Sequence, residues 1–294
     1  MPSKPIYTKL SRSEWFIFLI IASATILSFI ALDAGAQSDG LLHVYFLDVG
    51  QGDAQLIDSN GNQILIDGGP DNKVLGELGR VMPFNDKTIE AVVLTHPDAD
   101  HINGLIDVLE RYKVENVVEN FLDEHDSAAY RKWNELKKEA TVIQAKYGQR
   151  IELGNGAYLE IIYPINSESE QTKTNNNSII SRLTYGENQV LFTGDTEAKI
   201  EKELAARKID IDADFLKVPH HGSKTSTTEE LLEAVTPEAA FMQVGVDNRY
   251  GHPHPTVLER LESRGIKYYR TDTDGLIELI LSGQGYQIRS YTQN

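Results

Sequence analysis

The sequence contains no cysteine, and this absence excludes several kinds of site. Disulfides, thiolate metal ligands and cysteine nucleophiles cannot occur anywhere in these 294 residues. Basic residues are also few, because 28 lysines and arginines stand against 44 aspartates and glutamates, for a formal charge of -16. No strong basic run offers a track for a nucleic-acid backbone. Any metal must therefore be held by histidine, carboxylate, amide or water. A phosphodiester would have to bind at a local cationic centre.

The chain is long enough for one large domain or two small ones, and apolar residues, 40% of the total, suffice for a core. We find no linker and no low-complexity tract in residues 41–294, which we treat as one domain. Strands are expected at Leu41–Leu47, Ala54–Asp58, Gln63–Ile66, Ile89–Leu94, Val114–Val118, Thr141–Ala145, Arg150–Leu153, Tyr158–Tyr163, Ile179–Tyr185, Gln189–Phe192, Phe215–Val218, Ala239–Val244 and the C-terminus. Helices are expected at Val74–Val81, Leu105–Tyr112, Ser127–Ala140, Thr196–Arg207, Thr228–Ala234 and Thr256–Gly265, and residues 166–177 are expected to form a loop. This order favours two sheets packed face to face with helices outside.

The N-terminal residues have the pattern of an export signal. Lys4, Lys9 and Arg12 precede an apolar run over residues 15–32, and Ala34-Gly35-Ala36 follows it. A basic head, an apolar stretch and a small-x-small tripeptide predict a signal peptide, residues 1–36, cut after Ala36. The alternative is an uncleaved membrane anchor, since the run has the minimum length of a span. Both readings place the rest of the chain outside the cytoplasmic membrane, secreted or anchored.

The segment Thr95-His96-Pro97-Asp98-Ala99-Asp100-His101 concentrates four potential metal ligands directly after a hydrophobic strand. An irregular loop can turn their side chains toward one point, which we expect here. Imidazole and carboxylate together suit divalent metals. A polar turn in which Asp98 or Asp100 caps the next helix is the simpler alternative. Two histidines and two aspartates in this array favour metal binding.

Two later segments also place polar residues at the ends of strands. Asp195, in Thr193-Gly194-Asp195, could bridge two metals or simply cap a helix. In His220-His221-Gly222-Ser223, adjacent histidines point in different directions, so one can bind a metal while the other faces a substrate. A solvated turn is the alternative for this pair. Together with the His96–His101 cluster, these segments predict a shared cleft.

The chain resembles the metallo-β-lactamase superfamily, and within it the soluble hydrolase domain of the ComEC DNA-uptake family. The matching segments are Phe46-Leu47-Asp48-Val49-Gly50-Gln51-Gly52-Asp53-Ala54, Leu65-Ile66-Asp67-Gly68-Gly69, the His96–His101 cluster, Asn175-Asn176-Asn177-Ser178, Thr193-Gly194-Asp195, His220-His221-Gly222-Ser223 and Tyr250-Gly251-His252-Pro253. The resemblance implies an α/β fold, a four-layer αβ/βα sandwich with one or two divalent metals, Zn or Mn, at one edge. The membrane channel of that family has no counterpart here, so DNA import is not implied.

The resemblance also assigns the ligands. His96, Asp98 and bridging Asp195 would form a first metal position, and Asp100, His101, Asp195 and a histidine of the pair, preferably His220, a second. The family usually has histidine where Asp98 stands, and its intermediate histidine has no match, because Asn176-Asn177-Ser178 occupies that region. Either the first site is weak and favours a harder ion such as Mn, or a single metal is firmly held.

Further residues are candidates for supporting roles. Asp67 could orient a ligand histidine, as could Asp48 and Asp53, for which turn formation is the alternative. We expect Asp100, His221 and His252 to take part in catalysis. Contact with an anionic substrate is expected from the following residues, although Lys224 and Arg249 could equally be ordinary surface charges: Asn177, Ser223, Lys224, Arg249 and Tyr250.

These features predict an exported metal-dependent hydrolase, in which a metal lowers the pKa of an attacking water. A phosphodiester, with DNA among the candidates, is the expected substrate, and the membrane is a partner only through an uncleaved N-terminus. The alternatives are a cell-surface phosphorylcholine-type esterase and a module that captures DNA in competence without cutting it. A fold by itself does not decide among them.

Overall fold

The computed structural model describes residues 40–120, 126–165 and 174–292. The signal peptide or anchor expected at residues 1–36 lies outside these ranges, as does most of the loop expected at 166–177. None of the helices in the described ranges combines the length and apolar character needed to cross a membrane. The description below concerns the unit Gly40–Asn294.

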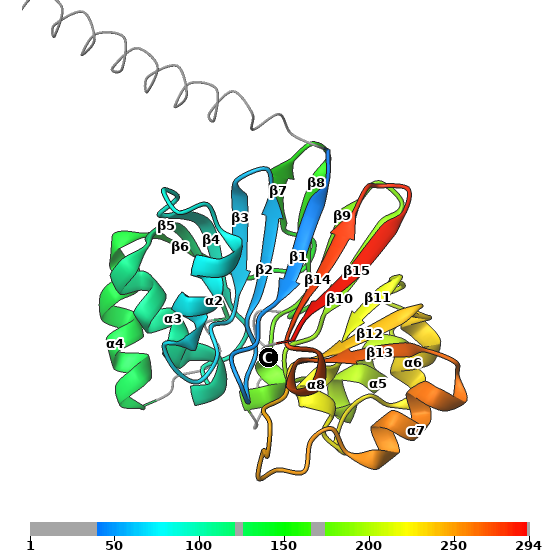
Figure 1. The fold of residues 1–294 in the computed structure, drawn as a ribbon. Helices are drawn as coiled ribbons and strands as arrows, with labels where there is room; N and C mark the ends of the chain where they lie inside the picture. The colour runs from blue at the N-terminus through cyan, green and yellow to red at the C-terminus, as the bar shows by residue number, and fades with distance from the viewer. Residues whose placement is uncertain (1–39, 121–125, 166–173, 293–294) are drawn as a thin grey trace, which may run out of the picture. The chain divides into compact units, whose positions relative to one another are not determined.

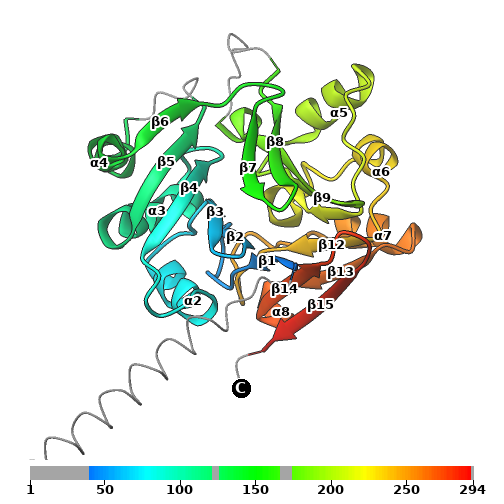
Figure 2. The same ribbon diagram turned by 90° about the horizontal axis from the view of Figure 1, so that it is seen from above.

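Two sheets form the centre of this unit (Figures 1 and 2). In spatial order, the eight described strands of the first sheet are β15 (Tyr286–Tyr291), β14 (Leu276–Leu281), β1 (Leu42–Phe46), β2 (Gln55–Ser59), β3 (Asn62–Ile66), β4 (Thr88–Leu94), β5 (Lys113–Glu119) and β6 (Thr141–Gln144). The seven of the second are β13 (Lys267–Arg270), β12 (Ala239–Met242), β11 (Phe215–Lys217), β10 (Asn188–Phe192), β9 (Ile180–Tyr185), β8 (Ala157–Tyr163) and β7 (Arg150–Gly154).

Helices cover the outer face of each sheet, as both views show (Figures 1 and 2). The first sheet is covered by α2 (Lys73–Val81), α3 (Ala99–Arg111), α4 (Ala128–Leu136) and η1 (Lys137–Glu139), and the second by α5 (Ala198–Ala206), α6 (Glu229–Val235) and α7 (Pro255–Ser263). Three short elements, η2 (Thr174–Asn177), η3 (Pro219–Gly222) and α8 (Thr271–Asp274), lie in connecting segments. The predicted four-layer sandwich is therefore confirmed.

Apolar side chains between the sheets hold the two halves together. Phe46 of the first sheet stacks on Phe241 of the second, with ring centroids 4.2 Å apart, and both are fully buried. Separate apolar clusters fill the space between each sheet and its helices. Burial of this surface is the main force that favours the sandwich.

Parallel pairing brings the chemistry-bearing loops to one end of the sandwich. In the first sheet β3 pairs in parallel with β4, and in the second β10, β11 and β12 are parallel to one another. The carboxyl ends of parallel strands lie at the same edge of a sheet, so the loops after these strands are neighbours. Those loops carry the predicted metal ligands.

The start of α3 differs from the prediction. We expected a helix only at Leu105–Tyr112, but α3 begins at Ala99, inside the His-Asp cluster. The amides of His101 and Ile102 both donate to the carbonyl of Asp98 at 3.0 Å, which closes the first turn. Polar ligands occupy this turn, so it lacks the apolar periodicity by which helices are found in a sequence.

Gly104 allows α3 to pack against the loop after β3. A Cβ at this position would lie 1.9 Å from the carbonyl oxygen of Gly68 and 2.8 Å from that of Asp71. The neighbouring amide of Gly68 donates to the carbonyl of His101 at 2.8 Å, so this contact also fixes the ligand helix.

We expect Gly104→Ala to lower the free energy of unfolding by about 1–3 kcal/mol, because the backbone must shift to admit the methyl group. Urea denaturation would measure the change. Gly79→Ala is the matched control, since nothing lies within 4 Å of a Cβ there and alanine should stabilise the helix by about 0.5–1 kcal/mol. Equal urea midpoints for Gly104→Ala and the unmodified protein would show that the contact is not tight.

Candidate metal centre

Three loops and one helix start bring the predicted ligands together. His96 and Asp98 lie in the loop after β4, and Asp100 and His101 lie in the first turn of α3. Asp195 follows β10 and the histidine pair follows β11. The expectation that one irregular loop carries the whole cluster is wrong, because α3 itself supplies two of its members.

Asp100, His101, Asp195 and His221 form a compact group. Asp195 Oδ2 lies 3.4 Å from His101 Nε2 and 3.3 Å from His221 Nε2. Asp100 Oδ2 lies 3.3 Å from His221 Nε2, and Asp100 Oδ1 lies 4.0 Å from His101 Nε2. A tetrahedral ion with bonds of about 2.1 Å would hold its ligand atoms roughly 3.4 Å apart. The spacing of this group therefore fits a divalent metal.

Histidine nitrogens that lack hydrogen-bond partners independently support a metal at this position. The Nε2 atoms of His96, His101 and His221 are buried and have no hydrogen-bond partner among the described residues. A buried polar atom without a partner is costly, so native structures rarely keep one. Those of His101 and His221 face the same two carboxylates, Asp100 and Asp195, which is the arrangement that a metal site needs.

His96 and Asp98 form the less complete part of the centre. His96 Nε2 lies 3.7 Å from Asp98 Oδ2, and the Asp98 side chain is 38% exposed. Asp98 is the N-cap residue of α3 by position, but its side chain makes no capping hydrogen bond. Asp195 is likewise no cap, because α5 has Glu197 at its N-cap. The capping alternatives for these two aspartates are thus not supported.

The geometry favours His221 over His220 as the histidine of the second position, which reverses the preference drawn from the family pattern. His220 Nε2 lies 3.8 Å from Asp195 Oδ2, and its ring contacts Asn175 and Thr225 at 3.4 Å. Both histidines have left-handed backbones, with φ of 49° and 54°. Two such residues in succession are strained and turn the chain sharply. This turn directs the buried His221 inward and leaves His220 at the mouth of the site.

Buried acceptors fix the rings of both inner histidines. His101 Nδ1 donates to Asp67 Oδ2 at 2.8 Å, and Asp67 in turn accepts from the amide and hydroxyl of Thr95 at 2.8 and 2.6 Å. His221 Nδ1 donates to the carbonyl of Gln243 at 2.8 Å and lies 3.2 Å from Asp53 Oδ1. Such partners set the tautomer that leaves Nε2 for a metal. The structure thus places Asp67 beside His101 and Asp53 beside His221.

Asp48 differs from the other two aspartates. Its Oδ1 accepts the amide of Gly50 at 3.4 Å, and its side chain is half-buried in the loop after β1. This is turn formation, the alternative that the sequence left open.

Two buried residues of the centre escaped the sequence analysis. Lys217 is fully buried at the end of β11, where it forms an ion pair with Asp53. Gln243 is fully buried after β12 and donates to the carbonyls of Leu47 and Ala54 at 2.8 Å. A long polar side chain within an apolar strand was the available signal in both cases.

The predicted substrate residues divide by exposure. Lys224 and Tyr250 are exposed, and the guanidinium of Arg249 lies 5.3 Å from the Tyr250 ring. Asn177 and Ser223 are buried, which favours a role inside the protein over direct substrate contact.

His252 stands beside the histidine pair. Its ring lies 5.6 Å from that of His220 and 6.4 Å from that of His221. Its Nδ1 is buried without a hydrogen-bond partner among the described residues. Burial, together with His221 and His220, lowers the pKa of His252 to about 4, so the ring is neutral at pH 7.

The ionisable groups of the centre shift one another's pKa values. Burial disfavours the imidazolium form of His101, but Asp195, Asp67 and Asp100 outweigh this and raise its pKa well above the usual value. Burial likewise opposes the charged form of His221, and Asp195 and Asp53 raise its pKa. Burial and His101 lower the pKa of His96 to about 3. Without a metal, the surroundings therefore favour the protonated forms of His101 and His221 and the neutral form of His96.

This charge state predicts that metal binding releases protons. Because the raised pKa values favour the protonated rings, His101 and His221 must lose an Nε2 proton to become ligands, so we expect metal binding to release protons. Because their pKa values are raised, metal affinity should increase as pH rises through the neutral range and above. Titration calorimetry in buffers of different ionisation enthalpy would count the protons, and a heat independent of buffer would contradict the assignment.

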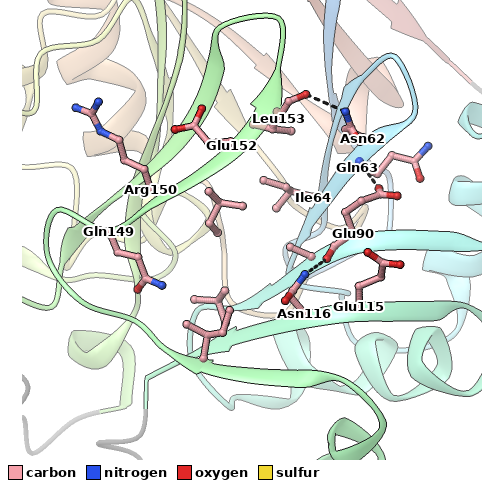
Figure 3. Close-up of a pocket in the computed structure, with 14 residues that line it drawn as sticks. Asn62, Gln63, Ile64, Glu90, Glu115, Asn116, Gln149, Arg150, Glu152 and Leu153 are labelled. Carbon is pink, nitrogen blue, oxygen red and sulfur yellow. Dashed lines mark hydrogen bonds between the residues drawn. The ribbon is translucent and has the colours of Figure 1, made fainter.

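A pocket lies away from this centre, at the amino ends of β3 and β4. It has a volume of about 330 Å³, and its lining contains no histidine. Figure 3 shows Glu90 and Gln149 on opposite sides of it, with Ile64 between them. The size of this pocket therefore does not locate the candidate metal centre, which is identified instead by its histidine and carboxylate donor atoms.

Comparisons with known proteins agree with this description. Residues 47–246 match the model of the Metallo-beta-lactamase superfamily. ComE operon protein 3 of Bacillus subtilis is 31% identical over 263 residues, which are 80% of this chain and 32% of the relative. Competence protein ComA of Neisseria gonorrhoeae is 27% identical over 244 residues, 81% of this chain and 32% of the relative. The chain thus spans about a third of the length of these relatives.

Among solved structures, the metallo-beta-lactamase fold protein YhfI of Bacillus subtilis superposes with a TM-score of 0.54 at 14% identity. The match covers 81% of this chain and 99% of that one. At this identity the likeness concerns the fold alone.

Proposed function

Because the chain belongs to the metallo-β-lactamase superfamily, we propose that it is a metal-dependent phosphodiesterase, and that a DNA strand is its substrate. The observation that carries the proposal is the group of Asp100, His101, Asp195 and His221, with two buried, unsatisfied histidine nitrogens facing two carboxylates. This donor set of imidazole and carboxylate suits Zn or Mn. The name of one relative, Competence protein ComA, supports a nucleic-acid substrate.

When bound, a divalent ion supplies Lewis-acid chemistry, since it acidifies water and neutralises developing negative charge. Asp100 is the ligand with access to solvent, because its side chain is 34% exposed whereas that of Asp195 is 4% exposed. Burial opposes ionisation of Asp100, but His101 and His221 lower its pKa below the usual range. Asp100 is therefore a carboxylate at pH 7, able to orient an attacking water and accept its proton.

Residues at the mouth complete the proposed site. His252 is neutral and can donate a hydrogen bond to a substrate oxygen or a leaving group. Lys224 is an exposed positive charge on the loop that follows His221. Because the chain as a whole carries a charge of -16, attraction of a phosphate depends on such local cations and on the metal.

The proposed enzyme acts outside the cytoplasmic membrane. Lys4, Lys9 and Arg12, the apolar run that follows them, and Ala34-Gly35-Ala36 support export. An exported nuclease would meet DNA before uptake, which is consistent with the word competence in the name of one relative.

The function is tested by assaying the purified protein with Mn or Zn against single-stranded DNA, bis-p-nitrophenyl phosphate, a phosphorylcholine ester and a β-lactam. We expect hydrolysis of the first two, and loss of both metal and activity in the Asp100→Ala/His101→Ala double variant. Hydrolysis of the phosphorylcholine ester alone would favour a cell-surface esterase. A metal-loaded protein that retains DNA but cleaves no phosphodiester would favour a capture module and overturn the proposal.

A further inference from the structure

Lys217 is a buried cation directly behind the metal centre. Its side chain is fully buried, and its Nζ forms an ion pair with Asp53 Oδ2. The same Nζ donates to the carbonyl of Gly194 at 3.1 Å and lies 3.7 Å from Asp195 Oδ1. One ammonium group thus joins the loop after β1, the loop after β10 and the end of β11.

A lysine at this position requires an explanation beyond packing. Phe215, two residues earlier and on the same face of β11, is fully buried and apolar, so an apolar side chain would suit this face of the strand. Burying an ion pair often contributes no net stability relative to apolar side chains of similar volume. Stability by itself therefore does not account for the charge.

The carboxylates around Lys217 provide the explanation. Asp53 and Asp67 are both buried, and an oxygen of each lies within 4.8 Å of the other and of His101. Asp195 is a third buried carboxylate in this small volume. Like charges so close together repel one another strongly in a poorly solvated interior, and a nearby cation offsets this repulsion.

We propose that Lys217 is a positioning residue for the metal centre. Its ammonium holds Asp53 beside His221 and anchors the Gly194 carbonyl next to Asp195, so that His221 Nε2 and Asp195 Oδ2 face the same ion. His221 Nδ1 lies 3.2 Å from Asp53 Oδ1, and His221 Nε2 lies 3.3 Å from Asp195 Oδ2. The inference rests on the metal centre of the proposed function and is independent of the substrate.

The other inner histidine is supported without a lysine. Asp67, which holds His101, accepts its hydrogen bonds from the amide and hydroxyl of Thr95. The carboxylate that holds His101 is therefore fixed by neutral donors. His221 Nδ1 donates to the Gln243 carbonyl and also lies beside Asp53, a carboxylate that is paired with a cation. Loss of Lys217 should accordingly affect the His221 side of the centre.

The test compares Lys217→Met with Lys137→Met in the full-length protein. Lys137 is the matched control, because it also pairs with a buried carboxylate, Glu119, which accepts the indole of Trp133 at 2.7 Å. Zn²⁺ affinity is measured by competition with a chelating dye well below the melting temperature, and bound Co²⁺ is examined by visible absorption. We expect Lys217→Met to weaken Zn²⁺ binding about 10–100-fold and to change the Co²⁺ spectrum. Lys137→Met should lower the melting temperature and leave Zn²⁺ affinity within about threefold, less than loss of a positioning partner causes.

Should Lys217→Met fail to fold, the double variant Asp53→Asn/Lys217→Met removes both charges of the pair and keeps the test decisive. It should fold and still bind Zn²⁺ more weakly than the unmodified protein. Unchanged Zn²⁺ affinity in the double variant, or equal losses in Lys217→Met and Lys137→Met, would overturn the inference. Absence of phosphodiesterase activity in a protein that binds Zn²⁺ would overturn the proposed function alone.

Discussion

The Asp195→Ala variant should lose most of its metal and on the order of a thousandfold or more of its phosphodiesterase rate, a loss of several kcal/mol of transition-state stabilisation. Asp195 Oδ2 is within 3.4 Å of His101 Nε2, 3.3 Å of His221 Nε2 and 3.8 Å of His220 Nε2. Asp100, by comparison, lies within 4.0 Å of the Nε2 atoms of two histidines, His101 and His221. Without it, two buried imidazoles lose their shared partner and an ion loses a central ligand.

Asp98→His is the informative comparison for Asp195→Ala. Asp98 is partly exposed and lies 3.7 Å from His96 Nε2, farther than Asp195 lies from His101 and His221, so its replacement should be milder. Histidine at this position also restores the superfamily's usual ligand and should shift metal preference from Mn toward Zn. Each variant is assayed across a metal series after circular dichroism has verified folding. A folded Asp195→Ala protein with full activity would remove Asp195 from the mechanism.

The second large effect is expected at the histidine pair. His221→Ala should weaken metal binding by more than the 10–100-fold typical of losing an outer partner, and reduce hydrolysis accordingly. The reason is that His221 Nε2 lies 3.3 Å from both Asp100 Oδ2 and Asp195 Oδ2 and is buried without a hydrogen-bond partner among the described residues.

His220→Ala supplies a closely matched control. Both histidines have left-handed backbones, so alanine changes the backbone preference similarly at the two positions. His220 is on the open side of the centre, with its side chain 22% exposed against 1% for His221, and its loss should weaken metal binding less than about tenfold. Metal content measured by elemental analysis and metal affinity measured by calorimetry decide which of the two histidines is the ligand. A larger loss in His220→Ala than in His221→Ala would restore the assignment taken from the family pattern.

Much of the fold was predictable because most strands coincide with apolar runs in the sequence. Thr88–Leu94 and Phe215–Lys217 were both located to within about one residue, since buried parallel strands are predominantly hydrophobic. The beginning of α3 was not, because its first turn is made of Asp100 and His101 rather than apolar residues. Polar residues of the candidate metal centre stand there in place of the apolar residues on which helix prediction depends.

The residues of the centre were predictable in kind but not in orientation. Spacing along the chain identified the His-Asp cluster, yet adjacent residues such as His220 and His221 differ only through backbone angles that sequence does not specify. Lys217 and Gln243 were missed for a related reason. Their importance comes from contacts with Asp53 and with Ala54, more than 150 residues away in each case, and no local pattern reveals such contacts.

The centre draws its ligands from both halves of the sandwich, because His101 belongs to the first and Asp195 and His221 to the second. An ion bound there has no equivalent site in the unfolded chain, so it adds to folding stability by mass action. Each tenfold excess of free metal over its dissociation constant contributes about 1.4 kcal/mol. The thermal stability of this protein is then set jointly by its sequence and by the metal supply around it, and its melting temperature should rise or fall as that supply changes.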